Sequence, residues 1–196
     1  MKKQIKDMDM KELGGFICDA LIAKDIRVVL SGGSCVEIYS RGEYTSWDLD
    51  LINQYNEQFK KIHETMDELG FTEHDRYFVH KDTKLFIEFP SGPLGVGDAP
   101  VEDIAEIDTE AGVLRLLTPT DCIKDRLAAY YHWDDEQCLQ QAVWVAEQNE
   151  FDLESVQEWS EKEKSLEKFN VFKNKLESIN DYLDTIIKAT KKGNLT

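Results

Sequence analysis

The sequence lacks several features that mark membrane, secreted and nucleic-acid-binding proteins. None of its apolar runs is long enough to cross a bilayer, and no apolar signal-type stretch follows the basic residues 2–3, so we expect a cytoplasmic protein with no membrane partner. The four cysteines are scattered without a Cys-x-x-Cys pair, which argues against a structural zinc site and a disulfide framework. Basic residues number only 23 against 39 acidic ones, giving a formal net charge of −16. Because such a field repels polyanions, we do not expect broad nucleic-acid binding.

The spacing of apolar residues predicts an α+β protein whose first part is a mixed β-sheet with flanking helices. A C-terminal helical region follows, with a boundary near residue 118, so we predict a core at 1–117 and helices at 118–196. Thr118 and Pro119 carry the signals that begin a helix, a capping hydroxyl and a first-turn proline. The predicted helices are 9–24, 34–41, 55–69, 119–132, 135–148 and one or two within 152–192. The predicted strands are 26–30, 47–52, 77–80, 84–89, 102–108 and 113–117.

Two carboxylates stand two residues apart in the predicted strand 47–52. Side chains alternate between the faces of a strand, so Asp48 and Asp50 point the same way while Leu49 and Leu51 occupy the opposite face. Unpaired like charges that close repel each other. A divalent cation such as Mg²⁺ (or Mn²⁺) removes the conflict, because it takes hard oxygen ligands from carboxylates and from substrate phosphates.

A glycine pair lies directly after the first predicted strand. Gly32 and Gly33 allow backbone N–H groups to approach an anion closely, and Ser34 is predicted to open a helix whose N-terminus favours negative charge. A triphosphate bound at this turn would place its metal beside the two aspartates. Strand, Gly-Gly-Ser, short helix, turn and Asp-x-Asp together form a more specific pattern than any one of these parts.

Residues 31–34 and 45–51, Ser-Gly-Gly-Ser and Thr-Ser-Trp-Asp-Leu-Asp-Leu, resemble the signature of the DNA polymerase β-like nucleotidyltransferase superfamily. Within it, the chain resembles small prokaryotic proteins related to abortive-infection toxins and minimal nucleotidyltransferases, some of them parts of toxin–antitoxin pairs. Residues 117–135 also look like the helical segment that follows the core in those proteins. The resemblance implies a nucleotidyltransferase fold that uses an NTP and Mg²⁺ to transfer a nucleoside monophosphate to an acceptor hydroxyl on RNA, a protein or a small molecule.

The resemblance also implies roles for individual residues. Gly32, Gly33 and Ser34 would contact phosphate, and Asp48 and Asp50 would hold metal. The family's third carboxylate, which lies on a later strand and helps to deprotonate the acceptor, has its best candidate in Glu88 as a further metal ligand and catalytic group, although aspartate is more usual there. Asp82, in a predicted turn, is a weaker substitute.

Two basic residues flank the apolar stripe of the predicted helix 119–132 on opposite sides. Either Lys124 or Arg126 can reach a triphosphate from the helical region, or pair with surface acids instead. Related sequences carry a basic residue just before Leu-Ala, which favours Arg126.

Two other functions fit parts of the sequence. The glutamate at the third carboxylate position, where aspartate is usual, and the acidic surface also suit a degenerate nucleotidyltransferase that binds a protein partner as an antitoxin or regulator. Arg126 and His132 loosely resemble the Arg-x5-His motif of HEPN ribonucleases, although Leu127 stands where a polar residue is usual.

Overall fold

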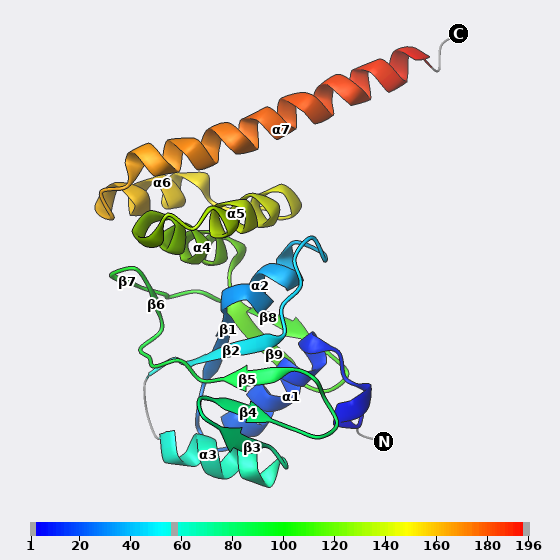
Figure 1. Cartoon of the computed structure of the whole chain (residues 1–196), viewed down its shortest axis with the longest axis vertical. Helices are drawn as coiled ribbons and strands as arrows, with labels where there is room; N and C mark the ends of the chain where they lie inside the picture. Colours follow the sequence, from blue (N-terminus) through cyan, green and yellow to red (C-terminus); the bar gives the residue numbers. More distant parts are fainter. Residues whose placement is uncertain (1–2, 56–58, 194–196) are drawn as a thin grey trace.

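We analysed a computed structural model of the chain, which describes the backbone of residues 3–55 and 59–193 and the side chains through residue 179. The helices are η1 (Ile5–Asp7), α1 (Met10–Ile22), α2 (Gly32–Tyr39), α3 (Phe59–Glu68), α4 (Pro119–Trp133), α5 (Glu136–Gln148), α6 (Leu153–Lys162) and α7 (Leu166–Gly193). The strands are β1 (Val28–Ser31), β2 (Asp48–Asn53), β3 (Thr72–His74), β4 (Tyr77–Val79), β5 (Phe86–Glu88), β6 (Gly95–Val96), β7 (Ala99–Pro100), β8 (Ile104–Asp108) and β9 (Val113–Leu117). Sheet first and helices after confirm the α+β class (Figure 1).

Seven strands form one mixed sheet in the order β3-β4-β5-β2-β1-β9-β8. β1 is antiparallel to β2 and parallel to β9, while β5 is parallel to β2. The carboxyl ends of β1 and β9 and the amino ends of β2 and β5 therefore meet at one end of the sheet. The turn into α2, the two aspartates and the chain into α4 all lie at that end.

Local sequence explains where the first helices begin. Asp9 caps α1 by accepting a hydrogen bond from the Glu12 backbone N–H, and the Glu12 side chain accepts one from Asp9 in return. At α4, the Thr118 hydroxyl accepts from the Asp121 backbone N–H at 3.1 Å, as the predicted start signal requires. Such a cap contributes about 1 kcal/mol to helix stability.

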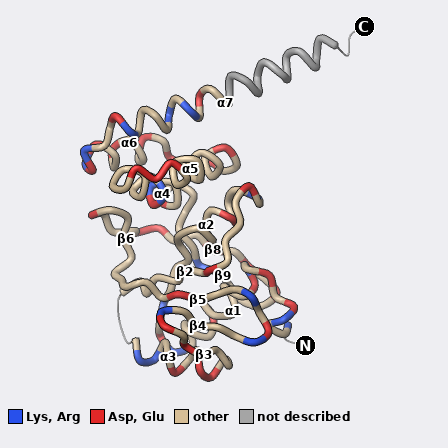
Figure 2. The backbone as a smooth tube through the Cα atoms, viewed as in Figure 1, with Lys and Arg blue, Asp and Glu red and all other residues tan. Residues whose placement is uncertain are grey.

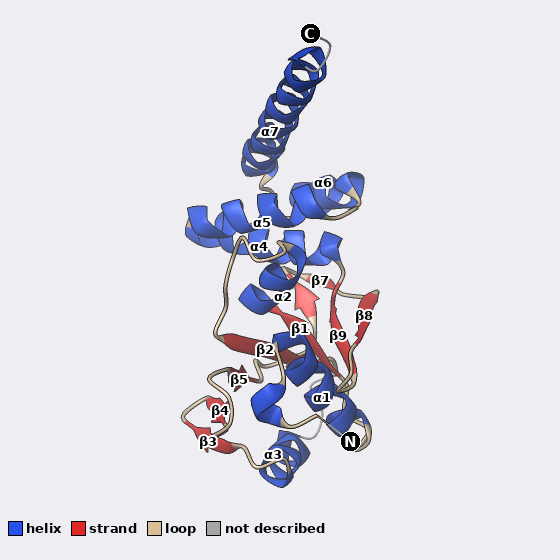
Figure 3. Cartoon of the chain, turned by 90° about the vertical axis from the view of Figure 1, so that its right-hand side faces the viewer, coloured by secondary structure: helices blue, strands red, loops and turns tan. Residues whose placement is uncertain are grey.

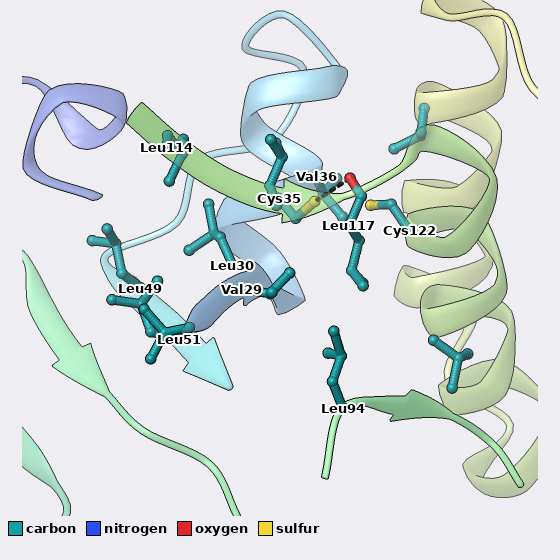
Figure 4. Packing of buried hydrophobic residues seen from close by; sticks show 14 of the residues in the cluster. Val29, Leu30, Cys35, Val36, Leu49, Leu51, Leu94, Leu114, Leu117 and Cys122 are labelled. Carbon is teal, nitrogen blue, oxygen red and sulfur yellow. Dashed lines mark hydrogen bonds between the residues drawn. The ribbon is translucent and has the colours of Figure 1, made fainter. Parts of the chain in front are cut away.

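The helices α4, α5 and α6 stack at the end of the sheet that carries the aspartates (Figure 3). They are joined to the core through α2, which contacts β1 and β2 on one side and α4 and α5 on the other. The Tyr39 hydroxyl donates to the Leu117 carbonyl at 2.7 Å, and the Asn149 side-chain amide donates to the Tyr39 carbonyl at 2.9 Å. One hydrophobic cluster runs through both regions, and Cys35 of α2 and Cys122 of α4 lie together within it (Figure 4).

The four cysteines are buried and free, and acidic residues are spread over the sheet and the helices alike (Figure 2). Among the described residues, no helix has both the length and the apolar character needed to cross a membrane.

Three local features differ from the prediction. The predicted helix 34–41 is present, but it runs two residues earlier in the chain, from Gly32 to Tyr39. The prediction missed β3, whose three side chains are all exposed and so show no alternation. It also missed the two-stranded ribbon of β6 and β7, which lies in the Gly/Pro-rich segment 90–100.

Candidate functional site

β2 places two carboxylates on the same face of the sheet. Burial alternates along the strand, with Asp48 and Asp50 half-buried and Leu49 and Leu51 fully buried on the other face. Leu49 and Leu51 pack into the core seen in Figure 4. The strand is thus anchored by its apolar face, which fixes where the aspartates point.

Glu88 lies beside these aspartates. β5 pairs with β2 in a parallel register that sets Glu88 next to Asp50 and Phe86 next to Asp48. Side chains of laterally paired residues share a face, so the three carboxylates belong to one surface of the sheet. The buried neighbour Ile87 points to the opposite face and holds β5 in the core.

The first turn of α2 lies directly against Asp50. Gly32 has φ +65, and a Cβ built on it would overlap Asp50 Oδ2 and lie 3.0 Å from Asp50 Cγ. Only glycine combines this left-handed backbone conformation with so close an approach to a carboxylate. The glycine turn and the aspartates therefore form one site.

The surroundings of Asp50 oppose its ionisation. Burial and, after it, the negative charges of Asp48 and Glu88 raise the pKa of Asp50 from 3.8 to about 7. The positive charge of Arg126 acts in the opposite direction. A carboxylate held this way gains most from a cation, because a cation removes both the desolvation penalty and the repulsion.

Two of the three carboxylates already have partners. Asp48 Oδ1 accepts a hydrogen bond from the Ser46 hydroxyl at 2.7 Å, and Glu88 Oε2 lies 3.4 Å from Arg76 Nε. Within the described part of the chain, no three His, Cys, Asp or Glu side chains are arranged closely enough to hold a metal ion as they stand. The donor groups suit a hard cation, but Glu88 is turned toward Arg76.

Ser34 lies deeper than its predicted contact with phosphate requires. Its side chain is fully buried and its hydroxyl donates to the Ser31 carbonyl at 3.5 Å. Gly33 is half-buried, and a Cβ there would lie 3.1 Å from Ser46 Oγ. In this arrangement the contribution of the turn to anion binding comes from its backbone.

The two predicted cations of α4 lie in different environments. Arg126 Nε and Nη2 donate to Asp125 Oδ2 at 3.0 and 2.5 Å, and Arg126 Nη1 donates to Gln141 Oε1 at 3.4 Å. The positive charge of Arg126 also lowers the pKa of Asp50. Burial lowers the pKa of Arg126, but Asp125 outweighs burial and keeps it above its ordinary value. Lys124 instead pairs with Asp121 at 3.2 Å and lines a separate polar pocket of about 370 Å³.

The arginine and histidine of the ribonuclease-like motif have different partners. Arg126 faces Asp125 and α5, whereas His132 is half-exposed with its Nε2 3.4 Å from Glu163 Oε2. No contact in the described structure joins the two side chains.

Sequence analysis missed Ser46 and Arg76. Ser46 stands two residues before Asp48, and a serine in a turn often hydrogen-bonds a group two residues away, so the sequence did contain a signal for this contact. Arg76 gives no such signal, because it reaches Glu88 only after β3, β4 and β5 are assembled.

The comparisons with known proteins give a structural likeness but no family match. No protein-family model matches the chain, and no curated protein matches it. A solution structure of the antibiotic-resistance factor ANT(2'')-Ia is similar to it at 14% sequence identity with a TM-score of 0.43, covering 89% of this chain and 94% of that one. At that identity and TM-score, function is inferred from the residues of this chain alone.

Proposed function

We propose that the protein is a nucleotidyltransferase that moves a nucleoside monophosphate from an NTP to an acceptor hydroxyl on RNA, a protein or a small molecule. The observation that carries this proposal is the contact between Gly32 and Asp50, on a sheet face that also bears Asp48 and Glu88. An anion-binding helix start and a carboxylate cluster are the two parts that nucleotidyl transfer requires of a protein.

The donor set of Asp48 and Asp50 fits Mg²⁺ or Mn²⁺, since both present carboxylate oxygens and both lack a cationic partner in direct contact among the described residues. A bound divalent ion would neutralise the triphosphate and the charge that develops in the transition state. The raised pKa of Asp50 is consistent with a carboxylate built to meet a cation.

In the proposed reaction the acceptor oxygen forms a bond to the α-phosphorus, and the bond from that phosphorus to the bridging oxygen of pyrophosphate breaks. Glu88 takes the proton of the acceptor hydroxyl, and pyrophosphate leaves with the bonding electron pair. The backbone of residues 32–34 holds the phosphates, and Arg126 adds positive charge from α4. The protein contributes mainly positioning and charge neutralisation.

The test incubates the protein with each α-labelled NTP and Mg²⁺ or Mn²⁺, with and without RNA and cell extract. We expect label to move to an acceptor, and we expect Asp48→Asn and Asp50→Asn to abolish the transfer. Asp108→Asn removes one exposed carboxylate of the same sheet and serves as the control. Absence of NTP binding together with unchanged cellular function of the double aspartate variant would sink the proposal.

A second function, a binding module acting as an antitoxin or regulator, is favoured by the ion pairs at the site. Glu88 forms an ion pair with Arg76, and Arg126 forms one with Asp125. Two of the proposed active-site residues are therefore already paired with other residues of the chain. The net charge of −16 would suit a basic protein partner. Co-purification of such a partner, together with function retained in Asp48→Asn/Asp50→Asn, would decide for this alternative.

A further inference from the structure

Arg76 occupies the tight turn that joins β3 to β4, between the paired residues His74 and Tyr77. Asp75 in the same turn has φ +55, which directs the chain back toward the sheet. The Arg76 side chain is 68% exposed, yet its Nη2 donates to Tyr77 Oη at 2.5 Å and its Cζ lies 4.8 Å from the centre of the Tyr77 ring. Arg76 is therefore a surface arginine held in a defined position.

That position faces the proposed metal site. Tyr77 pairs with Glu88 across β4 and β5, and Glu88 pairs in turn with Asp50 of β2. Arg76 Nε lies 3.4 Å from Glu88 Oε2, and the charge of Asp50 also reaches Arg76. Among residues 3–55 and 59–179, Arg76 is the only cation in an ion pair with any of the three carboxylates.

We propose that Arg76 is a positioning residue for the third carboxylate: it holds Glu88 aside in the metal-free protein and releases it when a divalent cation binds Asp48 and Asp50. This inference rests on the proposed function. It accounts for the finding that three carboxylates share a sheet face without forming a ready metal cluster. The Glu88 carboxylate can thus either pair with the Arg76 guanidinium or turn toward Asp48 and Asp50 to share a bound cation.

The exchange is physically easy. The Arg76 side chain is 68% exposed while that of Glu88 is 19% exposed, so water reaches the pair from the arginine side and weakens it. A divalent ion offers Glu88 twice the charge in the same neighbourhood. Tyr77 keeps the released guanidinium close by, through its hydroxyl and its ring face.

The test measures Mn²⁺ binding by titration calorimetry in the absence of nucleotide, so that no activity is needed. Arg76→Gln removes the competing cation, and Arg76→Lys keeps a charge that can still pair with Glu88. Arg27→Gln, an exposed arginine at the opposite end of β1, removes the same charge away from the site. Each variant is made in the natural sequence and in the Glu88→Gln background.

We expect Arg76→Gln to bind Mn²⁺ about two- to fivefold more tightly than the natural protein, as the loss of an exposed pair allows. Arg76→Lys and Arg27→Gln should stay close to the natural affinity. In the Glu88→Gln background the effect of Arg76→Gln should vanish, because the competition acts through that carboxylate.

An unchanged or weaker affinity of Arg76→Gln would overturn the inference. An equal gain in Mn²⁺ affinity in the Glu88→Gln background would overturn it too. Such a gain would show that removing a positive charge near the site strengthens Mn²⁺ binding without any part played by Glu88. If the natural protein binds no Mn²⁺, the proposed metal-dependent function falls together with the role of Arg76. If it binds Mn²⁺ and Arg76→Gln has no effect, only the role of Arg76 falls.

Discussion

Replacing Asp50 with asparagine should stabilise the metal-free protein at alkaline pH and leave its stability near pH 4 unchanged. The carboxyl of Asp50 is buried beside Asp48 and Glu88, which raises its pKa from 3.8 to about 7. Between those two pH values the folded protein keeps a proton that the unfolded chain has lost. Stability therefore falls as pH rises through this window and levels off above it.

The size of the effect follows from the same pKa difference. At about 1.4 kcal/mol for each pH unit, the separation between 3.8 and about 7 gives a ceiling of about 4 kcal/mol. Asparagine has nearly the same shape as aspartate and carries no charge, so the variant escapes this penalty at every pH. The advantage of Asp50→Asn should grow between pH 4 and 7 and then stay constant.

Urea unfolding in EDTA at pH 4, 5, 6, 7 and 8 measures this difference directly, because other carboxyl groups are common to both proteins. Asp108→Asn removes an exposed carboxylate as the control. A difference between Asp50→Asn and the natural protein that does not change with pH would refute the reasoning. So would a variant that is less stable than the natural protein at pH 8.

Three further outcomes follow from the geometry of the site. Mg²⁺ at a hundred times its dissociation constant should raise the unfolding free energy of the natural protein at pH 8 by about 2.7 kcal/mol, with a much smaller gain in Asp50→Asn, both measured by urea unfolding. Gly32→Ala should lower the unfolding free energy by more than about 1 kcal/mol and weaken Mn²⁺ binding in calorimetry, because the methyl group of the alanine would overlap Asp50. Gly42→Ala is the control: Gly42 has φ +93 and no neighbour within 4 Å of an added Cβ, so the variant should lose only the energy of the strained backbone. Arg126→Gln should weaken binding of a fluorescent NTP analogue about tenfold, because the charge of Arg126 acts on Asp50. Lys124→Gln should not, because Lys124 pairs with Asp121 in a separate pocket; equal losses would contradict that difference.

Local patterns predicted those parts of the site that lie close together in the sequence. The alternation of Asp48, Leu49, Asp50 and Leu51 fixes which side chains share a face, and the structure has the same alternation. The start of α4 at Thr118 followed from a hydroxyl and a proline whose effect is confined to one helical turn. Such features need no knowledge of the remainder of the chain.

The parts that depended on strand pairing lay beyond local patterns. Glu88 was selected as an acid in an apolar strand, but its position beside Asp50 comes from a parallel register that pairs residues 38 apart in sequence. Arg76 was missed for the same reason, since its link to Glu88 passes through two strand pairings. Gly32 was predicted as a turn residue, but its close approach to Asp50 depends on the pairing of β1 with β2 and could not be read from its neighbours in sequence.

The position of α2 has a consequence for how the protein unfolds. Its buried residues, Cys35 and Val36 among them, belong to the same cluster as Cys122 and Leu127 of α4. A chain cut after Leu117 would expose to water the side of α2 that packs against α4 and α5, and it would lose the hydrogen bond from Asn149 to Tyr39. The C-terminal helices are thus part of the folding unit that holds the glycine turn in place, and heat or denaturant should melt sheet and helices in one cooperative transition.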